Sequence, residues 1–334
     1  MKVQEIRDRI NDYETTIQGL QAFLLAVTWR GGKSAKHEYS LGRRMTPDDE
    51  EGSRNTQDVT PDATIQIGES LGYVLEAKRS FPFNQDFWEQ EALQILRYSS
   101  TLSGWWTDSG QIDIQNSIGL IWIEYISDFA AYLEEHIASH GNPPEKPVAL
   151  VQFSIVSGAK EFVFLRVDWG EIDDDELLED FSRGISIPLE LLKKPPQRQL
   201  KFYDQRPVTE YLMVVLWNDL FTSAASEIEF DDDLRSFAFE VSVDDLASDL
   251  QRFYGSEGLE TRDRKFPRAA WVRGALDAFA VLDLAEKSDE IGTYLIKFRK
   301  TLRTGESGDL IDRFSRHRTE EKNSDTSAKQ LDLI

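Results

Sequence analysis

The first part of the chain carries apolar side chains at helical spacing. From Ile6 to Leu24, isoleucine, leucine and tyrosine residues recur every three or four positions. This spacing places them on one side of a helix and predicts an amphipathic helix over about residues 3–28. The polar stretch 31–60 that follows contains paired glycines and a run of acidic residues. It therefore predicts a loop or a partly ordered insertion.

Further along, short apolar runs alternate with helical patterns. We expect strands at Ala63–Ile67, Tyr73–Lys78, Ile118–Ile126, Val148–Ile155 and Glu161–Val167, and helices at about 85–102 and 128–140. Glycines between the first two strands favour a hairpin. An order of helix, strands, helix and strands is typical of one α/β domain, which we place at residues 1–170.

The second half of the chain has a different pattern. We expect an acidic connector at 171–206, helices at Thr209–Ala224, Val243–Tyr254 and Pro267–Phe279, and strands at Val281–Glu286 and Thr293–Arg299. Three helices followed by a β-hairpin resemble a mainly α winged helix-turn-helix domain, here at residues 207–303. The polar and charged residues 304–334 predict a flexible tail.

Composition narrows the classes of protein. The 334 residues include 38 Lys and Arg against 60 Asp and Glu, so the formal net charge is −22. This acidity argues against non-specific coating of nucleic acid, which depends on cationic side chains, but not against local basic surfaces. The absence of cysteine excludes disulfides, Cys-ligated zinc, iron–sulfur clusters and a Cys nucleophile. We expect a cytoplasmic protein.

We expect no membrane partner. The first residues lack the apolar core of a signal peptide, and the longest fully apolar run is Leu212–Trp217. That run is far shorter than the ~20 residues that span a bilayer.

Candidate chemistry lies on the predicted hairpin. Asp62 opens its first strand, and Glu76 and Lys78 close its second strand, where both point to the same side. Burying Glu and Lys side by side is costly unless they are paired or bind a ligand. If Asp62 lies on the neighbouring strand, its carboxylate and that of Glu76 make an oxygen site suited to Mg²⁺ or Mn²⁺. Lys78 is then the candidate for stabilising charge on a reacting phosphate.

These residues resemble the signature of the PD-(D/E)XK nuclease superfamily. Pro61-Asp62 and Glu76-Ala77-Lys78 match its two motifs, and Gln94-Ile-Leu-Arg-Tyr98 on the next helix resembles the Gln-x-x-x-Tyr motif of the RecB-like branch. The resemblance implies a restriction-endonuclease-like α/β core, with Asp62, Glu76, Lys78, Gln94 and Tyr98 at the catalytic site. It also implies an acidic residue from the first helical region as a further metal ligand, for which Glu38 is the candidate.

The resemblance implies a metal-dependent DNA endonuclease that acts in DNA repair, restriction or anti-phage defence. The chain lacks a nucleotide-binding Gly-x-x-x-x-Gly-Lys-Ser/Thr motif, so any helicase or ATPase motor would be a separate subunit. Three alternatives stay open. In the first, Glu76 and Lys78 form only an ion pair on a half-exposed strand. In the second, the chain has a degenerate, inactive nuclease fold. In the third, it is a non-catalytic DNA-binding or scaffolding subunit.

A basic cluster surrounds the start of the third helix of the second domain. Its members are Arg262, Arg264, Lys265, Arg268 and Arg273, which with Asp263 give a local charge of 5 − 1 = +4. The start of this helix enters the major groove in helix-turn-helix proteins, so the cluster is a candidate DNA-binding surface. A surface that docks a protein is the alternative.

The last residues form a short apolar pattern at the end of a charged tail. Gln330, Leu331, Leu333 and Ile334 resemble the bacterial sliding-clamp-binding peptide. This resemblance implies a sliding clamp as a partner, whereas a tail that packs on its own protein is the alternative.

Overall fold

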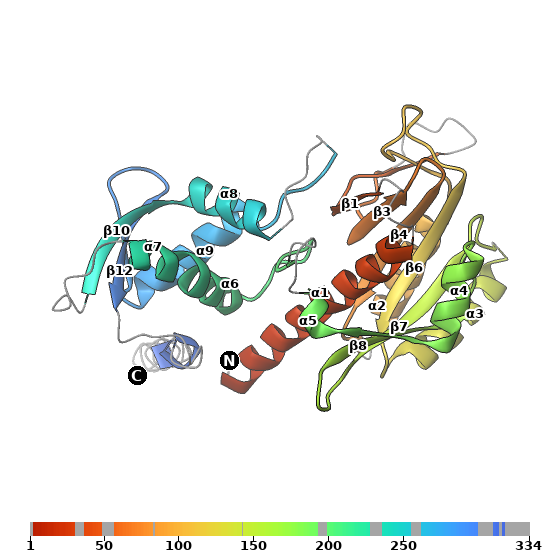
Figure 1. Cartoon of the computed structure of the whole chain (residues 1–334), viewed down its shortest axis with the longest axis horizontal. Helices are drawn as coiled ribbons and strands as arrows, with labels where there is room; N and C mark the ends of the chain where they lie inside the picture. The colour runs from red at the N-terminus through yellow and green to blue at the C-terminus, as the bar shows by residue number, and fades with distance from the viewer. Residues whose placement is uncertain are drawn as a thin grey trace, which may run out of the picture. The chain divides into compact units, whose positions relative to one another are not determined.

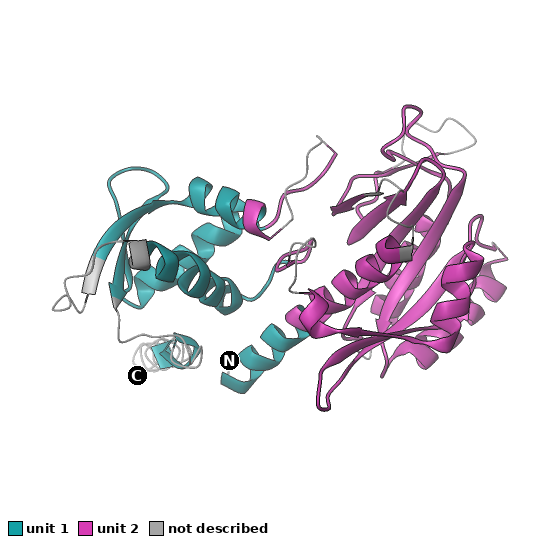
Figure 2. Cartoon of the chain, viewed as in Figure 1, with its two compact units in different colours: residues 1–13, 206–251, 267–334 teal, residues 14–205, 252–266 magenta. Residues whose placement is uncertain are grey.

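The chain forms two compact units (Figure 2). The computed structural model describes residues 3–30, 37–48, 57–82, 84–141, 143–192, 199–227, 236–254, 262–299, 310–313 and 316–317. Unit 1 contains residues 1–13, 206–251 and 267–334, and unit 2 contains residues 14–205 and 252–266. Both units are therefore discontinuous in sequence, whereas the sequence pattern predicted consecutive segments.

Unit 2 is a mixed α/β unit built on a seven-stranded sheet (Figure 1). In spatial order its strands are β1 (His37–Leu41), β3 (Ala63–Ile67), β4 (Leu71–Lys78), β6 (Ile114–Trp122), β7 (Val148–Val156), β8 (Phe162–Gly170) and β9 (Ile185–Pro188). The pairs β4–β6 and β6–β7 are parallel, and the other pairs are antiparallel. A separate two-stranded sheet joins β2 (Thr46–Pro47) to β5 (Leu102–Ser103).

Helices pack on both faces of this sheet, as its parallel centre requires. They are α1 (Val3–Arg30), α2 (Gln85–Tyr98), α3 (Ile126–His140), α4 (Asp175–Arg183) and the short α5 (Leu189–Leu192). On one face, Ile95 of α2 and Phe129 of α3 belong to one buried cluster with Leu150 of β7. On the other face, Phe23 of α1 contacts Tyr73 of β4.

Local features fix α2 beside β4. The helix begins after Asn84, whose side chain accepts a hydrogen bond from the backbone N–H of Asp86. Gly119 of β6 lies opposite Glu76, and a Cβ at this position would sit 2.6 Å from Leu150 and 3.0 Å from Ile95. The missing side chain therefore lets α2 approach the sheet next to Glu76.

The sequence pattern predicted this α/β architecture but missed several elements. The predicted loop at 31–60 contains β1 and β2, and the predicted connector at 171–206 contains α4, β9 and α5. Strand β9 pairs with β8, so this acidic stretch belongs to the sheet of unit 2. The acidic residues of α4 obscure its buried face, which consists of Leu177 and Phe181.

Unit 1 combines helices with a three-stranded antiparallel sheet. Its elements are α6 (Thr209–Val215), the π-helical segment η1 (Leu216–Phe221), α7 (Thr222–Glu227), β10 (Ser236–Ser242), α8 (Val243–Phe253), α9 (Ala269–Val281), β11 (Ala285–Lys287) and β12 (Thr293–Arg299). The strand order is β10-β12-β11, and β10 was not predicted. Trp217 packs against Phe279 and Phe298 in the core. Within the described parts of both units, no helix is long and apolar enough to cross a membrane.

Candidate active site

The hairpin of β3 and β4 brings Asp62 and Glu76 together. Ala63 pairs with Leu75, so Asp62, which directly precedes β3, lies next to Glu76 across the hairpin. Asp62 Oδ2 accepts a hydrogen bond of 2.9 Å from the backbone N–H of Ala77. Both acidic residues are only 3% exposed. Two buried carboxylates thus lie at the same edge of the sheet.

Helix α2 supplies the two polar side chains of its predicted motif to Glu76. The Tyr98 hydroxyl donates a hydrogen bond of 2.9 Å to Glu76 Oε2. Gln94 Nε2 donates one of 2.6 Å to the Tyr98 oxygen. Because residues four apart share a helix face, both reach the cluster from one side of α2.

Lys78 lies between two carboxylates. Its Nζ is 2.9 Å from Glu76 Oε1 and 3.1 Å from Oε1 of Glu91, which lies on α2. Glu91 was not among the predicted site residues. Its position could have been predicted, because it lies three residues before Gln94 and seven before Tyr98, which places all three on one face of a helix. We call Asp62, Glu76, Lys78 and Glu91 the carboxylate cluster.

The electrostatics of the carboxylate cluster are unbalanced. With every group ionised, one ammonium faces three carboxylates, which gives 1 − 3 = −2. Burial and the neighbouring Glu76 raise the pKa of the Asp62 carboxyl well above its usual value. Burial also raises the pKa of Glu91. Burial disfavours the charged form of Lys78, but Glu76, Asp62 and Glu91 outweigh it and raise the pKa of its ammonium.

The Tyr98 hydroxyl stays protonated in this environment. Burial and the charge of Glu76 raise its pKa well above the usual value. A protonated hydroxyl can donate its hydrogen to Glu76 while it accepts one from Gln94. The Gln94–Tyr98–Glu76 chain therefore fixes the orientation of the Glu76 carboxylate.

The oxygen donors of the cluster match the ligand chemistry of a hard divalent cation. Among the described residues, no three His, Asp or Glu side chains form a ready-made metal cage. Mg²⁺ is commonly held by one or two carboxylates and completes its shell with water. Asp62 and Glu76 supply two such carboxylates, and the excess negative charge of the cluster favours a cation.

Glu38 is not part of this cluster. It lies on β1 opposite Gln66, four residues along β3 from Asp62, which corresponds to about 13 Å of strand. Glu38 lies in the stretch 31–60 that was predicted to be a loop, and only the family resemblance suggested it as a ligand. Pairing of β1 with β3 instead fixes it at the far end of the strand. The structure thus does not support Glu38 as a ligand beside Asp62 and Glu76.

The five predicted DNA-binding residues are divided between α9 and the segment that precedes it. Helix α9 begins only at Ala269, so Arg268 caps it and Arg273 lies within it. Arg262, Arg264 and Lys265 precede it in a segment that belongs to unit 2. We call residues 262–266 the strap. The connection between α8 and α9 is longer than the turn of a helix-turn-helix, and this length separates the basic residues.

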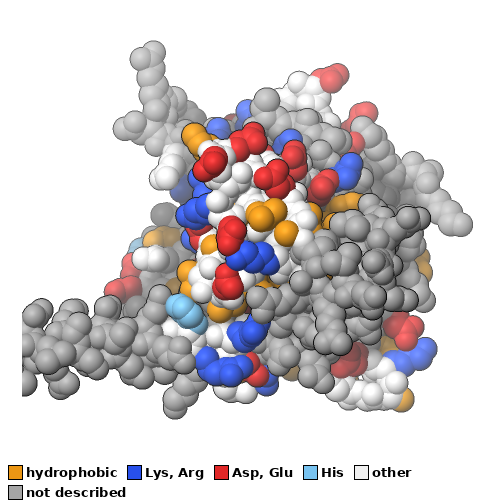
Figure 3. All heavy atoms as spheres, turned by 90° about the vertical axis from the view of Figure 1, so that its left-hand side faces the viewer, with side chains coloured by type: hydrophobic (Ala, Val, Ile, Leu, Met, Phe, Trp, Pro, Cys, Tyr) orange, Lys and Arg blue, Asp and Glu red, His pale blue; other side chains and the backbone are white. Residues whose placement is uncertain are grey.

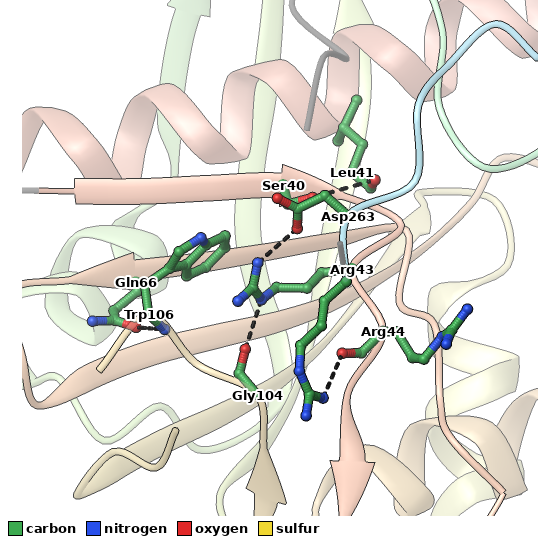
Figure 4. Close-up of polar contacts among 9 residues, drawn as sticks. Ser40, Leu41, Arg43, Arg44, Gln66, Gly104, Trp106 and Asp263 are labelled. Atoms are coloured by element: carbon green, nitrogen blue, oxygen red, sulfur yellow. Dashed lines mark hydrogen bonds and ion pairs between the residues drawn. The ribbon is translucent and has the colours of Figure 1, made fainter. Parts of the chain in front are cut away.

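A buried ion pair holds the strap (Figure 4). Arg43 Nη1 lies 2.7 Å from Asp263 Oδ1, and these side chains are only 1% and 4% exposed. Arg43 Nε donates a hydrogen bond of 2.6 Å to the carbonyl oxygen of Gly104. The guanidinium also lies 4.0 Å from the centre of the Trp106 ring. Asp263, which the sequence analysis counted only as a charge offset, is therefore an anchor.

The strap passes close to the Asp62 end of β3. The backbone N–H of Gly42 donates a hydrogen bond of 3.2 Å to the carbonyl oxygen of Asp62. A Cβ at Gly42 would sit 2.9 Å from the ring of Phe266, the last residue of the strap. Gly42 thus contacts both the strap and the residue that begins β3.

The clamp-like residues Gln330, Leu331, Leu333 and Ile334 lie outside the described residues. Comparison of the chain with protein families, with curated proteins and with solved structures gave no match.

Proposed function

We propose that the chain is a metal-dependent DNA endonuclease with its active site at the carboxylate cluster. The observation that carries this proposal is the convergence of Asp62, Glu76, Lys78, Gln94 and Tyr98 on one buried site. Separate segments of the chain contribute these residues, and their sequence motifs resemble one nuclease signature. A simple ion pair between Glu76 and Lys78 would not require Asp62 or the Gln94–Tyr98 chain.

The order of elements supports the same proposal. Asp62 and the Glu76-Ala77-Lys78 motif lie on adjoining antiparallel strands, with α1 before them and α2 after them. This is the arrangement that the resemblance to the PD-(D/E)XK superfamily implies. The chemistry of the side chains, rather than the fold, carries the functional argument.

Each residue has a defined task in the proposed reaction. Asp62 and Glu76 would hold the cation, and Mg²⁺ or Mn²⁺ at this place would supply Lewis-acid chemistry for polarising the phosphodiester and activating water. Lys78 stabilises the negative charge that develops on the phosphate. Tyr98 keeps Glu76 oriented, and Gln94 keeps Tyr98 oriented.

The test is cleavage by the purified full-length chain. We expect supercoiled plasmid or single-stranded DNA to be cut with Mg²⁺ or Mn²⁺ and to stay intact with a chelator. Asp62→Asn and Glu76→Gln should each remove cleavage, and Lys78→Ala should lower its rate by about 100- to 1000-fold, while the circular dichroism spectrum stays unchanged. Glu89→Gln, an exposed acidic position on α2, is the matched control and should cut like the wild type. Cleavage of RNA alone would overturn the choice of DNA as substrate.

A second proposal concerns unit 1, which we propose to be a winged-helix-like module. Its order of helix, strand, two helices and two strands, with strand order β10-β12-β11, supports this reading. The turn between β11 and β12 carries Asp289 and Glu290, and Ile291 there is 99% exposed. An acidic turn with an exposed apolar side chain favours docking of a protein over contact with phosphates.

On the face of the chain shown in Figure 3, acidic and basic side chains are interspersed. We propose that a separate helicase or ATPase subunit is the partner, in repair, restriction or defence. Ile291→Asp should abolish co-purification with such a subunit and leave plasmid cleavage by the isolated chain unchanged. Unchanged co-purification would contradict this docking site.

A further inference from the structure

Helix α2 supplies Lys78 with a second carboxylate that the proposed reaction does not use. Glu91 Oε1 lies 3.1 Å from Lys78 Nζ, and the Glu91 side chain is 7% exposed. Glu91 lies on α2, whereas Glu76 and Lys78 lie on β4. Lys78 is thus held from two different elements of the fold.

Stability alone does not account for Glu91. Its Oε2 is buried and has no hydrogen-bond partner among the described residues. A buried acceptor without a partner is destabilising. A well-packed apolar side chain at such a position is often at least as favourable as a buried ion pair. The carboxylate is therefore better explained by a role in the site.

That role follows from the number of partners that Glu76 would have in the proposed reaction: Tyr98, Lys78 and the cation. In the structure, Glu76 accepts a hydrogen bond from Tyr98 through Oε2 and pairs with Lys78 through Oε1. A divalent cation on Glu76 would weaken the attraction between Glu76 and Lys78, because it would compete for the same negative charge and repel the ammonium. Lysine has a flexible four-carbon stem, so an ammonium with one weakened partner would leave its position.

We infer that Glu91 is a positioning residue that anchors the Lys78 ammonium when Glu76 engages the cation. This inference rests on the proposed nuclease function, because it assigns the cation to Asp62 and Glu76. Glu91 acts through Lys78 and is not itself a metal ligand. Its position on α2 keeps this anchor separate from the hairpin that holds the cation.

The first test measures the position of Lys78 without using catalysis. The full-length chain is treated with an amine-reactive reagent in saturating Mn²⁺, and modification of Lys78 is followed by mass spectrometry. Because the Glu91→Gln variant no longer offers the ammonium a charged acceptor, it should label at least about tenfold faster than wild type. Glu89→Gln, on the same helix, should label like wild type. Equal rates for Glu91→Gln and wild type would overturn the inference.

The second test separates positioning from metal binding. Calorimetry with Mn²⁺ should give a Kd for Glu91→Gln within about threefold of wild type, whereas Glu76→Gln should bind much more weakly. In DNA cleavage, Glu91→Gln should lower kcat by about 10- to 100-fold with little change in KM. A loss of Mn²⁺ affinity equal to that of Glu76→Gln would make Glu91 a metal ligand and contradict the inference.

A double-mutant cycle tests whether Glu91 acts through Lys78. If it does, Lys78→Ala combined with Glu91→Gln should cut no more slowly than Lys78→Ala alone. Additive losses would contradict the inference. If Glu91→Gln does not fold, Glu91→Asp keeps the charge on a shorter stem and should label at an intermediate rate. A wild type that binds Mn²⁺ but does not cut any nucleic acid refutes the nuclease proposal alone, because the labelling test still decides the role of Glu91.

Discussion

Unit 2 contains two groups of buried charged side chains that are built in opposite ways. At the strap, one guanidinium faces one carboxylate, with Arg43 held by Asp263, by the Gly104 carbonyl and by the Trp106 ring. In the carboxylate cluster, the ammonium of Lys78 pairs with Glu76 and Glu91, Asp62 adds a third buried carboxylate, and Glu91 Oε2 has no hydrogen-bond partner among the described residues.

On the proposed function, this difference separates a structural ion pair from a site built for a cation. A buried pair with satisfied partners fixes a segment, and breaking it leaves an uncompensated charge. A buried group of carboxylates with excess negative charge is unfavourable until a cation arrives. Burial of charged groups alone therefore does not indicate function, whereas an excess of buried negative charge makes the carboxylate cluster a candidate site.

The largest effect on stability should come from breaking the balanced pair. Asp263→Ala leaves Arg43 buried without its carboxylate and should lower the free energy of unfolding by about 3–5 kcal/mol. Urea denaturation followed by tryptophan fluorescence measures this decrease. The double variant Arg43→Met with Asp263→Leu removes both charges and should recover most of it. A decrease below about 1 kcal/mol for Asp263→Ala would place the pair with ordinary surface ion pairs.

Cation binding should stabilise the unbalanced cluster. At a concentration of Mg²⁺ or Mn²⁺ that is 100 times the Kd, the free energy of unfolding should rise by about 2.7 kcal/mol. Asp62→Asn should remove this increment, whereas Asp263→Ala should retain it on its lower baseline. An equal increment in Asp62→Asn would show that the cation binds elsewhere.

Removing a carboxylate from the cluster should cost little when a chelator is present. Asp62→Asn keeps an acceptor for the Ala77 N–H and removes one of three buried negative charges. We expect its free energy of unfolding to stay within about 1 kcal/mol of wild type or to rise. If Asp62→Asn lowered the free energy of unfolding as much as Asp263→Ala, the carboxylate cluster would be structural, like the Arg43–Asp263 ion pair.

The smallest effect concerns the exposed basic residues of the strap. Arg262 and Lys265 lie on the segment that contacts Gly42 near Asp62. Arg262→Glu with Lys265→Glu should weaken DNA binding and reduce the slope of log K against log salt by about 1 for each phosphate that is no longer neutralised. Arg268→Glu with Arg273→Glu, in unit 1, is the matched comparison and should have a smaller effect. If Arg268→Glu with Arg273→Glu had the larger effect, DNA would bind at α9 rather than at the strap.

The sequence pattern predicted elements with continuous apolar runs or clear periodicity. Strand β3 was predicted with its observed bounds, and β7 was predicted to within one residue, because its side chains are apolar almost throughout. Strands β1 and β9 were missed because they are short outer strands of mixed composition, and strand β10 of unit 1 was also missed. Pairing across a sheet, which fixes such strands, is not visible in a single segment.

The same reasoning explains what could be predicted about the site. Strand alternation placed Glu76 and Lys78 on one side, and the predicted hairpin placed Asp62 beside them. Gln94 and Tyr98 were suggested by the family resemblance, and their spacing put them on one helix face. Glu38 was misplaced because its register on β1 depends on tertiary pairing. The anchor formed by Arg43 and Asp263 joins residues 220 positions apart, so no local pattern indicates it.

The most direct test of the account is the cleavage of end-labelled DNA by the full-length chain with Mn²⁺, compared with Asp62→Asn in parallel. Both proteins should be folded, and only the wild type should produce cleavage products, which should disappear when a chelator is added. Equal cleavage by Asp62→Asn, or cleavage that persists in the chelator, would contradict a metal-dependent active site at the carboxylate cluster.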